Sequence, residues 1–237
     1  MIKNRFLKVS ITSLVGLFSL SVFAAEDKNT ENWNDFSDPV AIYSNATIGG
    51  GNKGVDITGA YGGYLSGVYK HRFTAAAKND LEYYEFDYLL LNSSTESGVA
   101  IDSSWHRDIS FEDVDYRNVN DVSFGFFAKL GFFEKELNYT DGMNRSINFY
   151  PKVSVGYMWA EDMVDTTYIK LDATTRYAIN KMLWVGVTPT YTYGMEGLEL
   201  KEWAASLDAG IQLSSSFGIN ASVNDDKDFK GEVKFAF

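Results

Sequence analysis

The sequence predicts an all-β fold, namely a single transmembrane antiparallel up-and-down β-barrel of about twelve strands, with ten strands as the alternative. Three observations lead to this prediction: an export signal at the start, an alternation of apolar and polar side chains from Val40 onward, and aromatic residues near the ends of the alternating segments. The chain has 237 residues, 16% aromatics and no cysteine. After residue 25 no apolar stretch approaches the roughly twenty residues of a membrane-spanning helix, so we expect strands to cross the membrane.

Residues 1–24 have the organisation of a secretory signal peptide. Basic residues precede an apolar run over residues 9–23, which closes on Ala24 before the chain turns acidic. The alternative, a membrane anchor, would need a longer apolar run. The polar, acidic residues 25–38 are predicted to be a mostly disordered periplasmic leader. A plug that folds into the lumen, anchored by Trp33 or Phe36, is the second interpretation. Residues 39–237 would then form the barrel.

The alternation has a period of two, which is typical of strands with unlike faces. One face is apolar and the other carries charged residues, small residues and glycines. We expect the apolar face to point outward, so that Phe124, Val155, Leu171 and Ile211 contact lipid. A soluble sandwich also alternates, but an aromatic rim at the segment ends favours the membrane barrel.

The strand count is either twelve or ten, because a closed antiparallel barrel with both chain ends on one side needs an even number. If segment 55–73 divides at Gly62-Gly63, the count is twelve strands. If segment 107–117 is not a strand, the count is ten. Pro151 and Pro189 fall inside strands, where each removes a ladder donor and can mark a bulge. The eleven alternating segments are 40–49, 55–73, 80–92, 107–117, 119–133, 146–160, 166–179, 183–195, 199–214, 217–225 and 229–237.

The inward face predicts where a solute would pass. Its charges have both signs, so they could form a paired network in a narrow barrel or line a small channel in a wider one. The residues that alternation assigns to the lumen are Glu85, Asp87, Lys129, Lys152, Lys170, Asp172, Arg176, Asp208, Lys230, Glu232 and Lys234.

The chain ends in an alternating strand whose last residue is aromatic, Val233-Lys-Phe235-Ala-Phe237. This ending resembles the C-terminal insertion signal of Gram-negative outer-membrane β-barrels, although Gly231 lies four residues before Phe235 where the family pattern has three. The resemblance implies an outer-membrane location, contact with outer-membrane lipid and lipopolysaccharide, and recognition of Phe235 and Phe237 by the barrel-assembly machinery.

Few residues suit catalysis, and we predict no catalytic residue and no enzymatic activity. His106, Asp108 and Ser110 would share one strand face, but neighbours two apart lie about 6.6–6.8 Å from each other, too far for a hydrogen-bonded triad. The sequence also lacks the His-x-Ser-Asn pattern of outer-membrane lipases. A polar strand end is the simpler interpretation.

Composition argues against other ligand classes. The formal charge is −11 and falls to about −14 without the signal, so nucleic acid is not an expected partner. His71 lies between two cations, Lys70 and Arg72, which would repel a metal ion, and Asp113 with Asp115 lacks further oxygen ligands. We therefore predict no metal site and no cofactor.

The sequence favours a small channel or porin for hydrophilic solutes. In length and strand count the chain resembles the small twelve-stranded oligosaccharide porins, whose lumens tend to be basic for acidic sugars, whereas this chain is acidic. A non-conducting structural or surface-recognition barrel that contacts a host or phage is the alternative. An outer-membrane lipid hydrolase or acyltransferase would depend on His106 alone.

Overall fold

The computed structural model describes residues 34–111, 114–136, 144–180 and 182–237. Every strand pairing in this part of the chain is antiparallel. The one helical element is a 3₁₀ turn, η1 (Asn79–Leu81), and no helix here is long and apolar enough to span a membrane. The strands are β1 (Asn45–Gly51), β2 (Gly54–Ser66), β3 (Tyr69–Lys78), β4 (Tyr83–Asn92), β5 (Ser97–Phe111), β6 (Val114–Ala128), β7 (Leu130–Glu136), β8 (Asn144–Trp159), β9 (Thr166–Ala178), β10 (Leu183–Glu196), β11 (Lys201–Gln212), β12 (Phe217–Asn224) and β13 (Phe229–Ala236).

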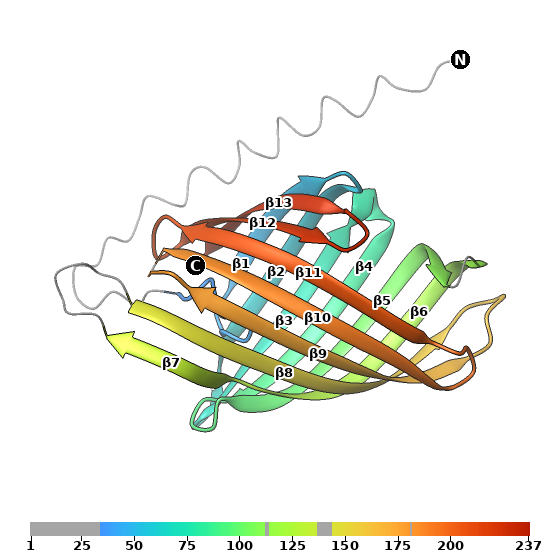
Figure 1. The fold of residues 1–237 in the computed structure, drawn as a ribbon, viewed down its shortest axis with the longest axis horizontal. Helices are drawn as coiled ribbons and strands as arrows, with labels where there is room; N and C mark the ends of the chain where they lie inside the picture. Colours follow the sequence, from blue (N-terminus) through green and yellow to red (C-terminus); the bar gives the residue numbers. More distant parts are fainter. Residues whose placement is uncertain (1–33, 112–113, 137–143, 181) are drawn as a thin grey trace, which may run out of the picture. The chain divides into compact units, whose positions relative to one another are not determined.

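The strands form one closed up-and-down barrel (Figure 1). Each strand pairs with its neighbours in the chain, β1 pairs with β13, and β6 pairs with β8. β7 continues β6 after a one-residue break at Lys129, since Phe127 faces Lys152 and Leu130 faces Phe149 in the same register on β8. β6 and β7 therefore count as one wall strand, and the predicted twelve-stranded barrel is confirmed in the described residues.

Three predicted strand boundaries are wrong. Segment 55–73 divides at Gly67, whose φ of 55° suits a tight turn, and not at Gly62-Gly63. Segment 107–117 spans the tip of the β5–β6 hairpin, and most of β5 was not predicted. Residues 40–44 precede β1 and are not a strand.

The prolines lie inside β8 and β10 as predicted. Pro151 pairs with Ala173 of β9 and lies on β8 beside the break between β6 and β7, where the N–H of Lys129 donates to the carbonyl of Glu96 at 2.7 Å. The shift in register comes two residues later, between Gly131 and Phe133. Pro151 thus accompanies an interruption of the ladder, because it has no N–H to donate.

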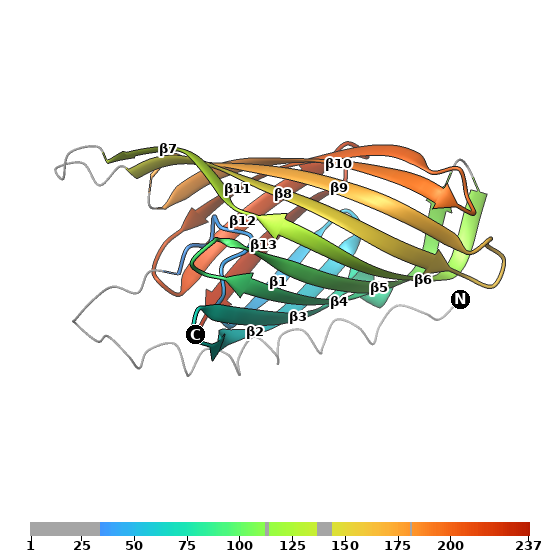
Figure 2. The same ribbon diagram turned by 90° about the horizontal axis from the view of Figure 1, so that it is seen from below.

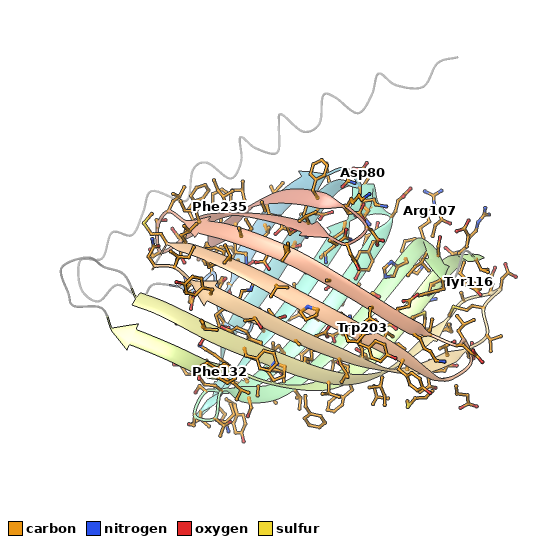
Figure 3. The ribbon with its side chains drawn as sticks, in the orientation of Figure 1. Asp80, Arg107, Tyr116, Phe132, Trp203 and Phe235 are labelled. Carbon is orange, nitrogen blue, oxygen red and sulfur yellow. The ribbon has the colours of Figure 1, made fainter. Side chains whose placement is uncertain are left out.

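The outer surface carries the apolar side chains that alternation assigned to it. Phe124, Val155, Leu171 and Ile211 are 46%, 50%, 44% and 37% exposed. Figure 3 shows Trp203 on β11 at the outer surface of the wall. A surface with many exposed apolar side chains on a closed barrel suits a lipid environment.

The wall of the barrel is uneven in height. β1, β12 and β13 have 7, 8 and 8 residues, whereas β5, β6 and β8 have 15, 15 and 16. The hairpins β5–β6, β8–β9 and β10–β11 therefore project beyond the β12–β13 turn (Figures 1 and 2). We call the end that holds the C-terminus the terminal end, and the other the hairpin end.

Candidate functional site in the barrel interior

The interior contains two central cavities of about 390 and 350 Å³. Both are bordered by Arg72, Thr74, Asp87 and Thr188, so they meet in the middle of the lumen. A third cavity of about 300 Å³ lies nearer the terminal end, beside Leu91 of β4 and the turn after it. The central cavities are lined mainly by polar side chains because inward positions alternate with apolar outward ones.

Charged side chains of the lumen form ion pairs that bridge separate strands. Lys152 on β8 pairs with Asp102 on β5, and Arg176 on β9 pairs with Asp208 on β11. The inward charges thus largely neutralise one another.

Gly186 of β10 makes room for the ion pair between Arg176 of β9 and Asp208 of β11, which spans β10. It faces Arg176 on one side and Asp208 on the other. A Cβ at this position would lie 2.7 Å from the Asp208 Oδ1 and 2.8 Å from the Arg176 Cδ. The absence of a side chain leaves the room in which the two charged groups meet.

All eleven predicted lumen residues border these cavities. Glu85, Asp87, Lys152, Lys170 and Asp172 line the cavity of about 350 Å³. Asp87, Arg176, Asp208, Lys230 and Glu232 line the cavity of about 390 Å³, as does Lys234. Lys129 lies at the third cavity. Their role toward a solute remains a prediction.

Sequence reasoning missed several lumen residues. Lys78 forms an ion pair with Glu85, and Asp56 Oδ2 lies 3.6 Å from Lys230 Nζ. Arg72 borders both central cavities. Their even-numbered positions on β2 and β3 carry the same alternation as the rest. Asp56 and Arg72 fell in segment 55–73, which was predicted as one strand, and Lys78 lay outside every predicted segment.

Residues 34–44, called the inner segment here, fold into the lumen. Phe36 is 5% exposed; its ring stacks on Tyr43 with centroids 5.5 Å apart and packs with Trp184 of β10. The N–H of Phe36 donates to Gln212 Oε1 at 3.2 Å, and a Cβ on Gly218 would lie 2.6 Å from the Phe36 ring. Burial raises the pKa of the Tyr43 hydroxyl. Residues 34–38 thus lie packed inside the barrel, which agrees with the plug interpretation for Phe36, while residues 25–33 with Trp33 lie outside the described part.

The inner segment then reaches the opposite wall. Val40 packs in a buried cluster with Leu89, Ala100, Phe127 and Tyr150, which come from β4, β5, β6 and β8. Contacts with β10, β11 and β12 on one side and with β4, β5, β6 and β8 on the other place the segment across the lumen.

Polar contacts also hold the inner segment. The guanidinium of Arg72 donates to the carbonyl oxygens of Ala41 and Pro39 at 2.6 and 2.9 Å. Lys129 Nζ lies 2.9 Å from Asp38 Oδ2. The segment therefore accepts hydrogen bonds from Arg72 and Lys129, two donors that face the lumen.

The hairpin end is filled by a second apolar cluster. Its buried members are Phe111, Val119, Met158, Met163, Tyr168 and Leu200. They come from the projecting strands β5, β6, β8 and β9 and from the turns after β8 and β10. The long hairpins thus pack on one another by their inner faces.

The barrel resembles solved structures of small porins. The KdgM porin in complex with disordered oligogalacturonate superposes with a TM-score of 0.50 at 7% identity, covering 83% of this chain and 99% of that one. The chain has the fold of the small outer-membrane porins. The alignment with a NanC porin covers 82% of this chain and 98% of the NanC chain, at 11% identity and with a TM-score of 0.48. No protein-family model matches the sequence, and no curated protein matches it.

In this porin fold the candidate catalytic residues are separated. His106 stacks on Tyr83 with ring centroids 4.0 Å apart, and Ser110 donates a hydrogen bond to Asp115. Asp108 is exposed and lies 3.8 Å from Arg117. The three side chains of the considered triad therefore have other partners. Among the described residues, no group of three or more His, Cys, Asp or Glu could hold a metal ion, and Asp113 lies outside them.

The aromatic residues of the predicted assembly signal lie at the terminal end of this porin fold. The Phe235 ring lies 5.1 Å from that of Phe217, centroid to centroid, on the neighbouring strand (Figure 3). Phe237 is 82% exposed, and its N–H donates to the carbonyl of Ser44 at 3.0 Å. The Phe237 side chain is thus accessible on the surface of the closed barrel.

Proposed function

We propose that this protein is a channel of the bacterial outer membrane for small hydrophilic solutes. The observation that carries the proposal is the polar interior of a closed barrel, with two adjoining central cavities of about 390 and 350 Å³. Side chains that donate and accept hydrogen bonds there can replace the hydration of a passing solute.

The proposed solute class follows from the charges of the interior. Cations such as Lys152 and Arg176 are paired with Asp102 and Asp208, so the wall lacks a field of one sign. The KdgM porin binds oligogalacturonate, an acidic sugar. The paired interior of this chain favours instead solutes of low net charge.

Two alternatives have less support. At the hairpin end the turns have two residues between β1 and β2, four between β12 and β13 and six between β8 and β9, so a surface-recognition barrel would present mainly the projecting hairpins and no long loop in the described residues. The enzyme alternative has little support because the side chains of His106, Asp108 and Ser110 contact other residues and do not form a catalytic triad. We propose a non-enzymatic channel, secreted by signal peptide 1–24 and assembled through Phe235 and Phe237.

The test is single-channel recording of refolded protein in a planar bilayer. We expect discrete conductance with weak ion preference. A unit charge about 5 Å from an ion in water contributes about 0.8 kcal/mol, or about fourfold in local ion concentration. Asp172→Lys should therefore shift the permeability ratio toward anions by at least about fourfold at 0.1 M salt, and less at 1 M, where the Debye length is about 3 Å.

The control is Asp226→Lys, which makes the same charge change at an exposed turn residue of the hairpin end. It should leave the ratio close to that of wild type. Cleanly inserted wild-type protein and variants that never conduct would refute the channel and favour a static ion-paired barrel.

A further inference from the structure

The inner segment divides the lumen. Asp38 borders both the cavity nearer the terminal end and the central cavity of about 390 Å³, and Val40 borders both the cavity nearer the terminal end and the central cavity of about 350 Å³. The segment therefore stands between the central cavities and the terminal end. A solute moving between the central cavities and the terminal end would have to pass these residues.

The attachment of this segment differs from that of the wall. Its residues pair with no strand in the described part of the chain. The backbone–backbone hydrogen bonds shown for residues 34–43 are internal, from Asp38 to Asp35 and from Ala41 to Asp38. What holds the segment is side-chain contact, which can break without opening any ladder of the barrel.

We propose that the inner segment is a tethered plug that keeps the channel closed and leaves its place in the lumen when the channel opens. The inference rests on the proposed channel function. β1 remains paired with β13 and β2 throughout, so the tether is the junction at Ser44 and Asn45.

Arg72 is the residue that couples the plug to a solute. Its guanidinium now donates to two backbone carbonyls, those of Pro39 and Ala41. A hydrophilic solute with oxygen acceptors in the central cavities competes for the same donors. Solute and plug thus exclude each other at Arg72, and occupancy by solute favours the open state.

The first test loosens the plug without changing the wall. The variant Phe36→Ala with Asp38→Asn removes the ring in the Trp184 cluster and the charge paired with Lys129. We expect the open fraction in planar bilayers to rise about tenfold, because the closed state loses contacts that the open state does not have. The matched control, Phe132→Ala with Asp226→Asn, removes a ring and a charge from exposed positions and should behave as wild type.

The second test locks the plug. The chain has no cysteine, so Asp38→Cys with Lys129→Cys gives a unique thiol pair. Linking the pair with a short, reducible bis-methanethiosulfonate reagent should abolish conductance, and a reductant should restore it. Heat-modifiable gel mobility checks that every variant is folded.

A third measurement does not depend on conductance. Ser37 is 8% exposed, so the single thiol of Ser37→Cys should react slowly with a membrane-impermeant reagent. Adding Phe36→Ala should speed the reaction about tenfold. Faster labelling without conductance in any variant would refute the channel and leave the mobile segment standing. Equal conductance in the linked and reduced forms, with unchanged labelling, would refute the plug and leave the channel standing.

Discussion

At the scale of single residues, inward glycines make space for large inward neighbours. Gly210 faces Trp184 in the β10–β11 pairing, and a Cβ on Gly210 would lie 2.0 Å from the indole ring. Gly156 likewise faces Tyr168 in the β8–β9 pairing, and a Cβ on Gly156 would lie 2.1 Å from the Tyr168 ring. Glycine in a strand interior often marks such a close approach. The indole of Trp184 is 2% exposed and packs against Phe36, so Gly210 also fixes the surface on which the inner segment rests.

Replacing Gly210 by alanine should destabilise the barrel. The added methyl group forces Trp184 out of its position, and overpacking of this kind costs about 1–3 kcal/mol. The free energy of unfolding in urea, measured on refolded protein in lipid vesicles, gives the value. Gly59→Ala is the control, because a Cβ there has no atom within 4 Å. Equal stabilities for the two variants would mean that Trp184 is not held against Gly210.

At the scale of elements, alternation located the strands well where one face is apolar throughout. The predicted segments 166–179, 183–195 and 217–225 differ from β9, β10 and β12 by one residue at an end. Gly62-Gly63 was a misleading signal, since a Cβ on Gly62 would lie 3.0 Å from the Tyr43 nitrogen. The glycine there serves contact with the inner segment, which no local pattern indicates.

The candidate site was predictable only in part, for the same reason. Alternation depends on local sequence and could assign Asp172 or Arg176 to the inward face. The contact of Asp38 with Lys129 joins residues 91 positions apart. That of Phe36 with Gln212 joins residues 176 apart. Such long-range contacts depend on closure of the whole barrel.

The terminal strand β13 offers a test at this scale. Phe237→Ala should lower the yield of folded, membrane-inserted protein, because the exposed terminal ring anchors the strand at the interface and carries the proposed recognition. The measurement is the heat-modifiable band shift of the outer-membrane fraction. Phe229→Ala removes an exposed ring from the other end of β13 and should have the smaller effect. A folded yield equal to that of wild type would remove Phe237 from the assembly signal.

At the scale of the whole molecule, the barrel is filled at both ends. The inner segment occupies the terminal end, and the apolar cluster around Val119 and Leu200 occupies the hairpin end. The central cavities between them hold the polar groups on which the proposed function depends. A route to the outside at the hairpin end therefore passes the low side of the wall, where β1, β12 and β13 are short.

The uneven wall has a consequence for the surrounding lipid. At a tilt of about 40°, eight residues of strand rise about 20 Å and sixteen rise about 40 Å. The outer apolar band of such barrels is about 25 Å tall, so β12, β13 and β1 fall short of the hydrocarbon thickness on one side only. This one-sided hydrophobic mismatch should thin the bilayer beside the β1–β13 seam. Refolding into vesicles of 12-carbon lipids should accordingly exceed refolding into vesicles of 18-carbon lipids, and equal yields would exclude the mismatch. The seam would then gather the shorter and more disordered acyl chains of the membrane around it.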